Sequence, residues 1–116
     1  MTSTTTEVTT IAPIGHAEAM DLQATELDRA LDLLRSLRAD DWTARTACPD
    51  WDVRRMWLHV LGACEAGASM RENAHQLRAA RRRRRQDGTP LEAGLSSTQV
   101  AERIELDPDE LVARLA

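Results

Sequence analysis

The chain has 116 residues, of which 29% are charged, and a formal net charge of −4. This length suits one domain and excludes a multidomain architecture. No apolar run approaches the roughly 18 residues that suggest a membrane span, and the first residues lack the basic and apolar regions of a secretory signal. We therefore expect a cytoplasmic protein without a membrane partner, in which Cys48 and Cys64 are reduced thiols.

The basic residues are all arginine, and lysine, tyrosine and phenylalanine are absent, which indicates a G+C-rich bacterial genome. The charge is unevenly distributed. Residues 71 to 86 contain seven arginines and one acid, Glu72, so this segment carries +6 and the remainder −10. A basic cluster on an acidic body predicts a contact within the protein or with a partner as readily as with nucleic acid.

Residues 1 to 14 are rich in threonine and have no apolar periodicity, so we predict a disordered tail outside a domain of residues 15 to 116. Residues 16 to 38 have the three-to-four spacing of an amphipathic helix. Its predicted apolar stripe consists of Met20, Ala24, Leu27, Leu31 and Leu34, widened by Ala30, Leu33 and Leu37. A turn-like stretch follows, in which Pro49 prevents one helix from running into the next.

A second helix is predicted over residues 53 to 81, with Asp52 as its N-cap. Its predicted buried stripe is Val53, Trp57, Val60 and Cys64, with Met56 and Leu61 beside it, while Leu58 is assigned to the polar side. Beyond Gly67 the stripe loses coherence because Arg71 stands where an apolar residue is due. We expect a bend there, or a solvated extension that ends in the arginine run.

Residues 86 to 90 are predicted to form a loop, followed by two short helices. Ser96 and Gln99 match a capping box at the start of the first, and Asp107 with Pro108 marks the start of the second. The last helix is still in apolar period at Ala116, so we expect the structure to continue beyond it. No segment alternates like a strand, and the predicted class is all-α.

The segment LLRSLRADDWTARTACPDWDVRRMWLHVLGACEA combines a leucine-rich helix ending in LRSL with DDW, CP-x-W, VR and LH-x-x-G. It resembles the N-terminal part of the mycothiol-dependent maleylpyruvate isomerase family, whose members have a DinB-like four-helix bundle. The resemblance covers residues 27 to 116. It implies a partial DinB-like bundle, formed by a long helical hairpin and two short C-terminal helices.

In that family the histidine of LH-x-x-G is one of three protein ligands to a divalent metal, usually zinc, and His59 occupies this position. The other two ligands, an acid and a histidine four residues later, lie on a later helix, so we expect an incomplete metal site here. The resemblance implies zinc and mycothiol as cofactors and an electrophilic small molecule as substrate. In the family the mycothiol thiolate adds to the cis double bond of maleylpyruvate, the new single bond rotates, and elimination gives the trans isomer. Whether this chain itself is an enzyme is left open.

Without the resemblance, His59 is interpreted as a half-buried histidine with a hydrogen bond, since a zinc site needs three or four ligands. Three other residues are candidates for replacement ligands. Cys64 is predicted to be a small core residue and Cys48 a structural loop residue. His75 lies about 24 Å further along a straight helix, too far to share an ion with His59. Trp51 and Trp57 are predicted to anchor the loop and second helix against the first.

Two other functions compete with a thiol-dependent enzyme. The arginines of residues 81 to 85 could neutralise phosphates, with the last two helices as a helix-turn-helix, but Asp109 and Glu110 would open the recognition helix and repel phosphate. A nucleic-acid partner is therefore not expected. The chain could instead be a catalytically inactive interaction module, in which a homodimer rebuilds a four-helix bundle from two hairpins and brings two His59 side chains into one interior.

Overall fold

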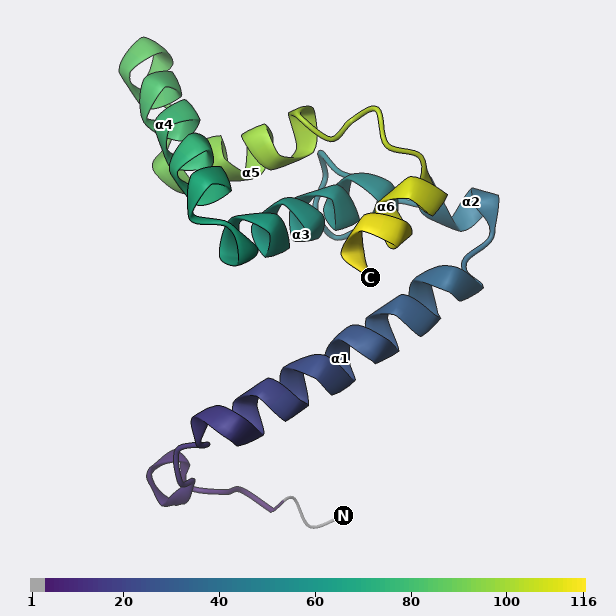
Figure 1. The fold of residues 1–116 in the computed structure, drawn as a ribbon, viewed down its shortest axis with the longest axis vertical. Helices are drawn as coiled ribbons and strands as arrows, with labels where there is room; N and C mark the ends of the chain where they lie inside the picture. The colour runs from purple at the N-terminus through teal and green to yellow at the C-terminus, as the bar shows by residue number, and fades with distance from the viewer. Residues whose placement is uncertain (1–3) are drawn as a thin grey trace.

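The structure is a computed structural model that describes residues 4 to 116, and these residues form helices and loops without a β-strand. None of the described helices is both long enough and apolar enough to cross a bilayer. Residues 4 to 15 are exposed throughout; the predicted disorder of the tail stays a prediction, and its residues 1 to 3 lie outside the described residues. Along the chain (Figure 1) the elements are η1 (Val8–Thr10), α1 (His16–Ser36), α2 (Ala39–Trp42), α3 (Val53–Ala68), α4 (Met70–Asp87), α5 (Leu91–Ala101) and α6 (Pro108–Leu115).

The predicted helix of residues 53 to 81 is present as two helices, α3 and α4. Asp52 caps α3 as expected, because its carboxylate accepts a hydrogen bond of 2.8 Å from the backbone N–H of Arg55. The chain breaks at Ser69, whose backbone is extended and whose hydroxyl accepts from the N–H of Glu72 at 3.2 Å. A serine at this position satisfies a free amide of a new helix and so favours a restart over continuation. Figure 1 shows α4 turning away from α3 at this point.

The arginine run is helical, since α4 continues to Asp87 and ends at Gly88 in the left-handed conformation, with φ of 76°. The predicted capping box of Ser96 and Gln99 is wrong: α5 already begins at Leu91, directly after Pro90, and both residues lie inside it. A proline before the helix sets its start, so the later serine has no free amides to cap. The start of α6 is as predicted, because Asp107 accepts from the N–H of Glu110 at 2.8 Å.

The buried side of α3 differs from the prediction. Leu58 is fully buried and Cys64 is exposed, whereas the predicted stripe had placed them the other way round. α3 packs against α5 and α6 through the side that carries Leu58, Leu61 and Gly62, and this choice depends on helices that come later in the chain. The core cluster consists of Leu31, Leu34, Trp42, Leu58, Leu61, Val100, Leu111 and Leu115.

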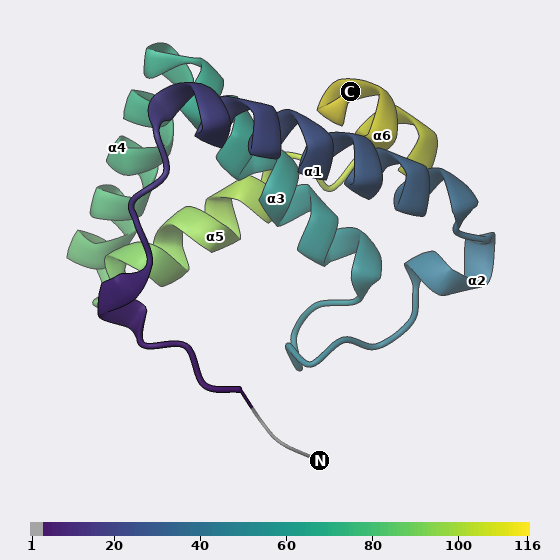
Figure 2. The same ribbon diagram turned by 90° about the horizontal axis from the view of Figure 1, so that it is seen from below.

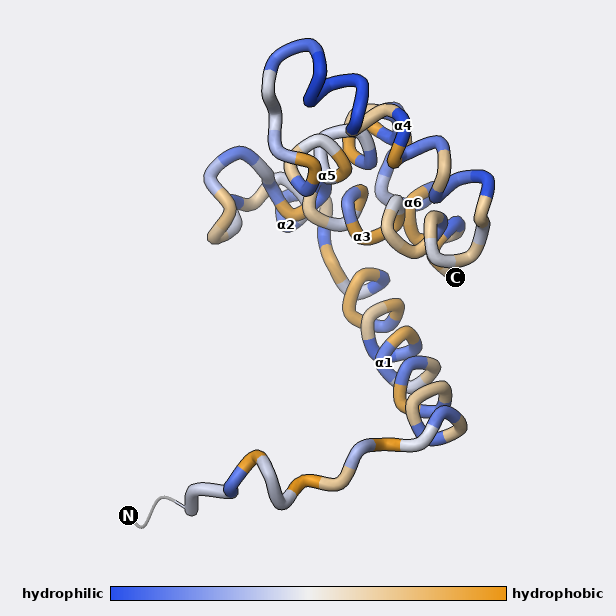
Figure 3. The backbone as a smooth tube through the Cα atoms, turned by 90° about the vertical axis from the view of Figure 1, so that its left-hand side faces the viewer, coloured by the Kyte–Doolittle hydropathy of each residue, from blue (hydrophilic) through white to orange (hydrophobic). Residues whose placement is uncertain are grey.

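Within the described part of the chain, helix α1 packs mainly through its C-terminal half. Leu31 and Leu34 are buried, and the contacts of α1 are mainly with α6. Most of its other apolar side chains, including Met20, Leu22 and Leu27, are exposed. Figure 2 shows α1 running across α3, and Figure 3 shows apolar turns of α1 outside the packed body. The amphipathic helix is therefore confirmed, but half of its predicted stripe, namely Met20, Ala24, Leu27 and Leu33, is exposed in residues 4 to 116.

Candidate functional site

His59 lies on the wall of a groove between α1 and α3. The groove encloses about 680 Å³ and reaches Leu115 at the end of α6. Its α1 wall is formed by Met20, Gln23 and Leu27, and its α3 wall by His59, Val60, Ala63, Cys64, Gly67 and Ala68. The stripe predicted to be the core side of α3 thus partly faces this groove. The exposed Cys64 thiol and the half-buried His59 imidazole are the reactive groups that line it.

The His59 ring is held by two residues from other parts of the chain. Its Nδ1 atom lies 2.6 Å from Oε1 of Gln99 on α5. The Trp51 ring, in the loop before α3, is tilted by 32° to the imidazole at a centroid distance of 5.3 Å. This is the half-buried, hydrogen-bonded histidine that the residues alone suggested, and the contact engages only one of its two ring nitrogens.

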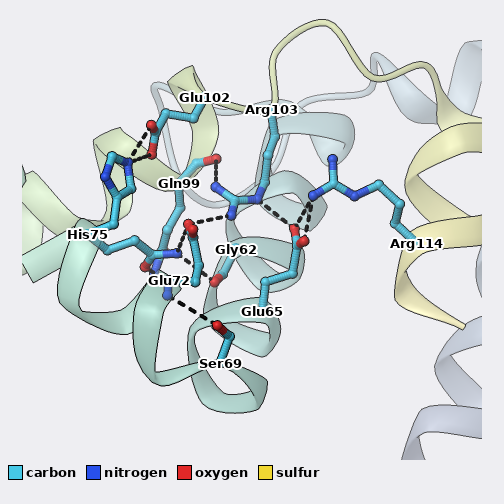
Figure 4. A network of polar contacts seen from close by, with 10 residues as sticks. Gly62, Glu65, Ser69, Glu72, His75, Gln99, Glu102, Arg103 and Arg114 are labelled. Carbon is cyan, nitrogen blue, oxygen red and sulfur yellow. Dashed lines mark hydrogen bonds and ion pairs between the residues drawn. The ribbon is translucent and has the colours of Figure 1, made fainter.

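A chain of buried polar side chains lies behind His59, and most of it is drawn in Figure 4. The amide nitrogen of Gln99 donates to Oε1 of Gln76 at 2.9 Å. The amide nitrogen of Gln76 donates to the backbone carbonyl of Gly62 at 2.9 Å and to Glu72 at 3.1 Å. Both glutamines are buried, so these bonds replace those that water would otherwise supply.

The hydrogen-bond network behind His59 ends at Arg103, which is only 5% exposed. Its guanidinium donates to Glu65 and to Glu72, each at 2.9 Å, and to the backbone carbonyl of Gln99 at 3.2 Å. Glu65 also accepts from Arg114 of α6 at 2.7 Å. Arg103 thus donates from each of its three guanidinium nitrogens, to two carboxylates and a carbonyl. The network thus ties α3, α4, α5 and α6 together (Figure 4).

The same contacts shift the pKa values of the three charged groups. Burial acts to raise the pKa of Glu65, but hydrogen bonds from Arg114 and Arg103 outweigh it and hold that pKa below its ordinary value. The pKa of Glu72 is lowered by hydrogen bonds from Gln76 and Arg103. Burial acts to lower the pKa of Arg103, but its two carboxylate partners raise it. Glu72 and Glu65 are therefore acceptors over the whole neutral range.

The other predicted candidates are not assembled around His59. The hydroxyl of Thr46 accepts from the backbone N–H of Cys48 at 3.1 Å, in keeping with a structural loop role. Cys64 is not a core residue, because α3 turns this side toward the groove. His75 pairs with Glu102 at 2.7 Å. In residues 4 to 116 no cluster of three or more His, Cys, Asp or Glu side chains could hold a metal ion, so these residues alone do not fit a complete metal site.

The arginine cluster forms a separate surface on α4. Arg78, Arg81, Arg82 and Arg85 line a shallow hollow of about 300 Å³ on one side of the helix. These four arginines are exposed, and none forms an ion pair within residues 4 to 116. The acids Asp109 and Glu110 occupy the first turn of α6, as predicted. The expectation that nucleic acid is not a partner stays a prediction.

Sequence reasoning missed the buried polar residues Gln76, Gln99 and Arg103. The sequence contains a signal for two of them, because residues four apart in a helix lie on the same side, and Gln99 and Arg103 have this spacing. Gln76 likewise lies four residues before Ala80, which is fully buried. Long polar side chains at such positions are more often solvent-exposed, and only the packing of α4 on α5 shows that they are buried.

These elements define an all-α, DinB-like helical domain in which a histidine on the third helix borders a groove. The family model of the mycothiol maleylpyruvate isomerase N-terminal domain matches residues 23 to 116, and the chain belongs to this family. The match confirms the resemblance carried by the CP-x-W and LH-x-x-G motifs. No curated protein and no solved structure matches the chain.

Proposed function

We propose that this domain supplies His59 as one of three protein ligands to a divalent metal, zinc by family resemblance, in a mycothiol-dependent cis-trans isomerase or thiol transferase. The other two donors would come from outside residues 4 to 116, since these residues hold no three-donor cluster. Zinc with three protein ligands has an open position that can bind a thiol and favour its thiolate form. The electrophilic substrate stays unassigned, and the cytoplasmic location stays a prediction.

The contact between His59 Nδ1 and Gln99 is the observation that carries this proposal. Histidines that bind metals commonly donate from one ring nitrogen to an oxygen acceptor and ligate through the other. His59 has such an acceptor at 2.6 Å, and its side chain lines a groove wide enough for a small thiol. His75 also has an oxygen acceptor, the carboxylate of Glu102 at its Nε2, but it is exposed on α4 and does not line the groove.

A paramagnetic metal tests whether His59 is the donor. We expect Co²⁺, added to the untagged chain, to broaden the NMR signals of residues around His59 and to do so only weakly, since one imidazole gives low affinity. His59→Ala should abolish this broadening, while the matched variant His75→Ala should retain it. Broadening that is unchanged in His59→Ala, or centred on His75 in the native chain, would contradict the proposal.

A second candidate function is a homodimeric interaction module, and the exposed apolar side of α1 favours it. Met20 and Leu27 face the groove without covering partners in the described chain. The first half of α1 carries Glu18, Asp21 and Glu26 and no arginine, for a charge of −3, whereas residues 28 to 38 carry three arginines against two aspartates, for a charge of +1. An antiparallel pair of α1 helices would place each acidic half beside the arginines of the other copy, as a two-fold dimer allows.

Sedimentation velocity distinguishes this candidate. We expect a dimer at micromolar concentration that Leu27→Glu converts to monomer, because the charge would be buried in the apolar contact. Leu22→Glu is the matched control, since Leu22 is also exposed on α1 but does not line the groove. A native chain that is monomeric at these concentrations would exclude the dimer.

A further inference from the structure

We propose that Gln99 is a positioning residue that fixes His59 in the tautomer with hydrogen on Nδ1, and that Gly62 completes this arrangement by letting Gln99 approach α3. The LH-x-x-G motif would then encode one structural unit: a histidine, and three residues later the space for the side chain that orients it. This tautomer matters for the proposed function, on which its purpose rests, because it leaves Nε2 of His59 free to bind a metal. The tautomer itself is a property of the metal-free protein.

The direction of the hydrogen bonds follows from the far end of the polar chain. A backbone carbonyl and a carboxylate can only accept, so Gln76 must turn its amide nitrogen toward Gly62 and Glu72. Its Oε1 atom then faces Gln99, which must present its own amide nitrogen there. What remains for His59 is the Oε1 atom of Gln99, which can only accept.

His59 must therefore donate from Nδ1 across the 2.6 Å contact, whether the imidazole is neutral or charged. In the neutral ring this leaves the lone pair on Nε2, which points away from Gln99. The ring nitrogen available to an electrophile or a hydrogen-bond donor is thus selected by residues on α4 and α5, the next two helices in the sequence. The chemistry that recognises such a nitrogen is a Lewis acid or an N–H or O–H donor.

Arg103 holds Glu72, the acceptor at the far end of this hydrogen-bond network, in place. It pairs with Glu72 at 2.9 Å, and the hydrogen bonds from Gln76 and Arg103 hold the pKa of that carboxyl below its ordinary value, so Glu72 is an acceptor at neutral pH. The side chain of Gln76 is only 1% exposed, which leaves no room for water to reverse the direction. The order of donors and acceptors is consequently determined from Arg103 to His59.

Gly62 explains how Gln99 comes so close to α3. A Cβ atom built at Gly62 would lie 2.6 Å from Cβ and 2.7 Å from Cγ of Gln99, which real side chains do not tolerate. Gly62 and His59 are three residues apart and so share one side of α3. Gly67, on the same helix, has nothing within 4 Å of an added Cβ and provides a matched comparison.

The tautomers can be read directly from ¹⁵N NMR of the histidine rings in the metal-free native chain, at a pH where imidazoles are neutral. We expect His59 to show a protonated Nδ1 and an unprotonated Nε2. His75 is an internal reference of the opposite kind, because its Nε2 faces the carboxylate of Glu102. Signals are assigned with His59→Ala and His75→Ala. A native His59 that carries its hydrogen on Nε2 overturns the proposal without the need for any further variant.

Two substitutions then test the cause. Gln99→Met keeps the length of the side chain and removes the acceptor, and Gly62→Ala displaces Gln99; both should shift His59 toward the Nε2–H tautomer that free histidine favours. Gly67→Ala should leave the native tautomer unchanged. If a folded Gln99→Met variant retains the hydrogen on Nδ1 as fully as the native chain, Gln99 is not the positioning residue. Should Gln99→Met not fold, Gly62→Ala and the native spectrum still decide the question.

The tautomer and Co²⁺ measurements together separate the positioning role of Gln99 from the metal role of His59. A native Nδ1–H tautomer together with no His59-dependent Co²⁺ broadening would uphold the positioning role and reject the metal role. An Nε2–H tautomer with His59-dependent broadening would do the reverse.

Discussion

Helix α1 and the unit formed by α3, α4 and α5 distribute their side chains in opposite ways. The unit buries Gln76, Gln99 and Arg103 and satisfies their hydrogen bonds within the chain. Helix α1, in contrast, leaves Met20 and Leu27 exposed although they belong to its apolar side. Buried polar groups require fixed partners, whereas exposed apolar groups leave a surface free to bind. The unit therefore holds His59 in place, and α1 offers the uncovered wall of the groove beside it.

The largest expected effect separates two neighbouring residues of α1. Leu34 is 2% exposed and Leu33 is 56% exposed. Leu34→Ala should lower the free energy of unfolding by about 3 kcal/mol, because it leaves a cavity in the core. Leu33→Ala should change it by less than about 0.5 kcal/mol. Urea unfolding of both variants measures the difference; equal effects would mean that α1 is packed along its whole length or not at all.

The polar unit is tested by Arg103→Ala. We expect a loss of about 2 to 3 kcal/mol of unfolding free energy, below the full cost of breaking a buried pair because Glu65 and Glu72 keep some contact with water. Arg114→Ala is the control, since Arg114 contacts Glu65 from the surface and should cost less than about 1 kcal/mol. If chemical denaturation shows the two variants to be equally stable, the buried network does not hold the unit together.

A smaller effect concerns how the two helices begin. α3 has a side-chain cap at Asp52, whereas Gly15 before α1 offers none. Asp52→Ala should cost about 1 kcal/mol, because an amide at the start of α3 loses its acceptor. Gly15→Ser should add at most a few tenths of a kcal/mol, measured by thermal unfolding. A loss on Asp52→Ala no greater than the gain on Gly15→Ser would contradict the difference in capping.

The smallest expected effect is on acid stability. The pKa values of Glu65 and Glu72 are lowered in the folded protein, so their contribution is complete above the unfolded value of 4.5 and is lost as the pH falls through the folded values. The urea midpoint should therefore fall more steeply below pH 4.5 in the native chain than in Arg103→Ala. The variant Leu34→Ala should keep the native slope, since it leaves both carboxylates paired. Parallel curves for the native chain and Arg103→Ala would refute this assignment.

Local signals predicted the starts of two helices, α3 and α6, but not the break at Ser69 or the end of α4 at Gly88. Asp52 and Asp107 cap helices where expected, and Gly88 ends α4 in the left-handed conformation that glycine favours. The wrong start at Ser96 shows the limit of such signals. A capping sequence acts only where amides are free, and α5 had already begun after Pro90.

The helical class, the family and the position of His59 could be predicted from the sequence alone, because periodicity, caps and the LH-x-x-G motif are local properties of the chain. The sequence could not determine which side of α3 is buried, since Leu58 and Cys64 lie on two apolar sides and the choice belongs to α5 and α6. Nor could it assign Gln99 to His59, forty residues away, because that contact exists only after α5 has packed against Gly62. The LH-x-x-G motif identifies the histidine, and the packing of α4 and α5 determines which of its ring nitrogens carries the hydrogen.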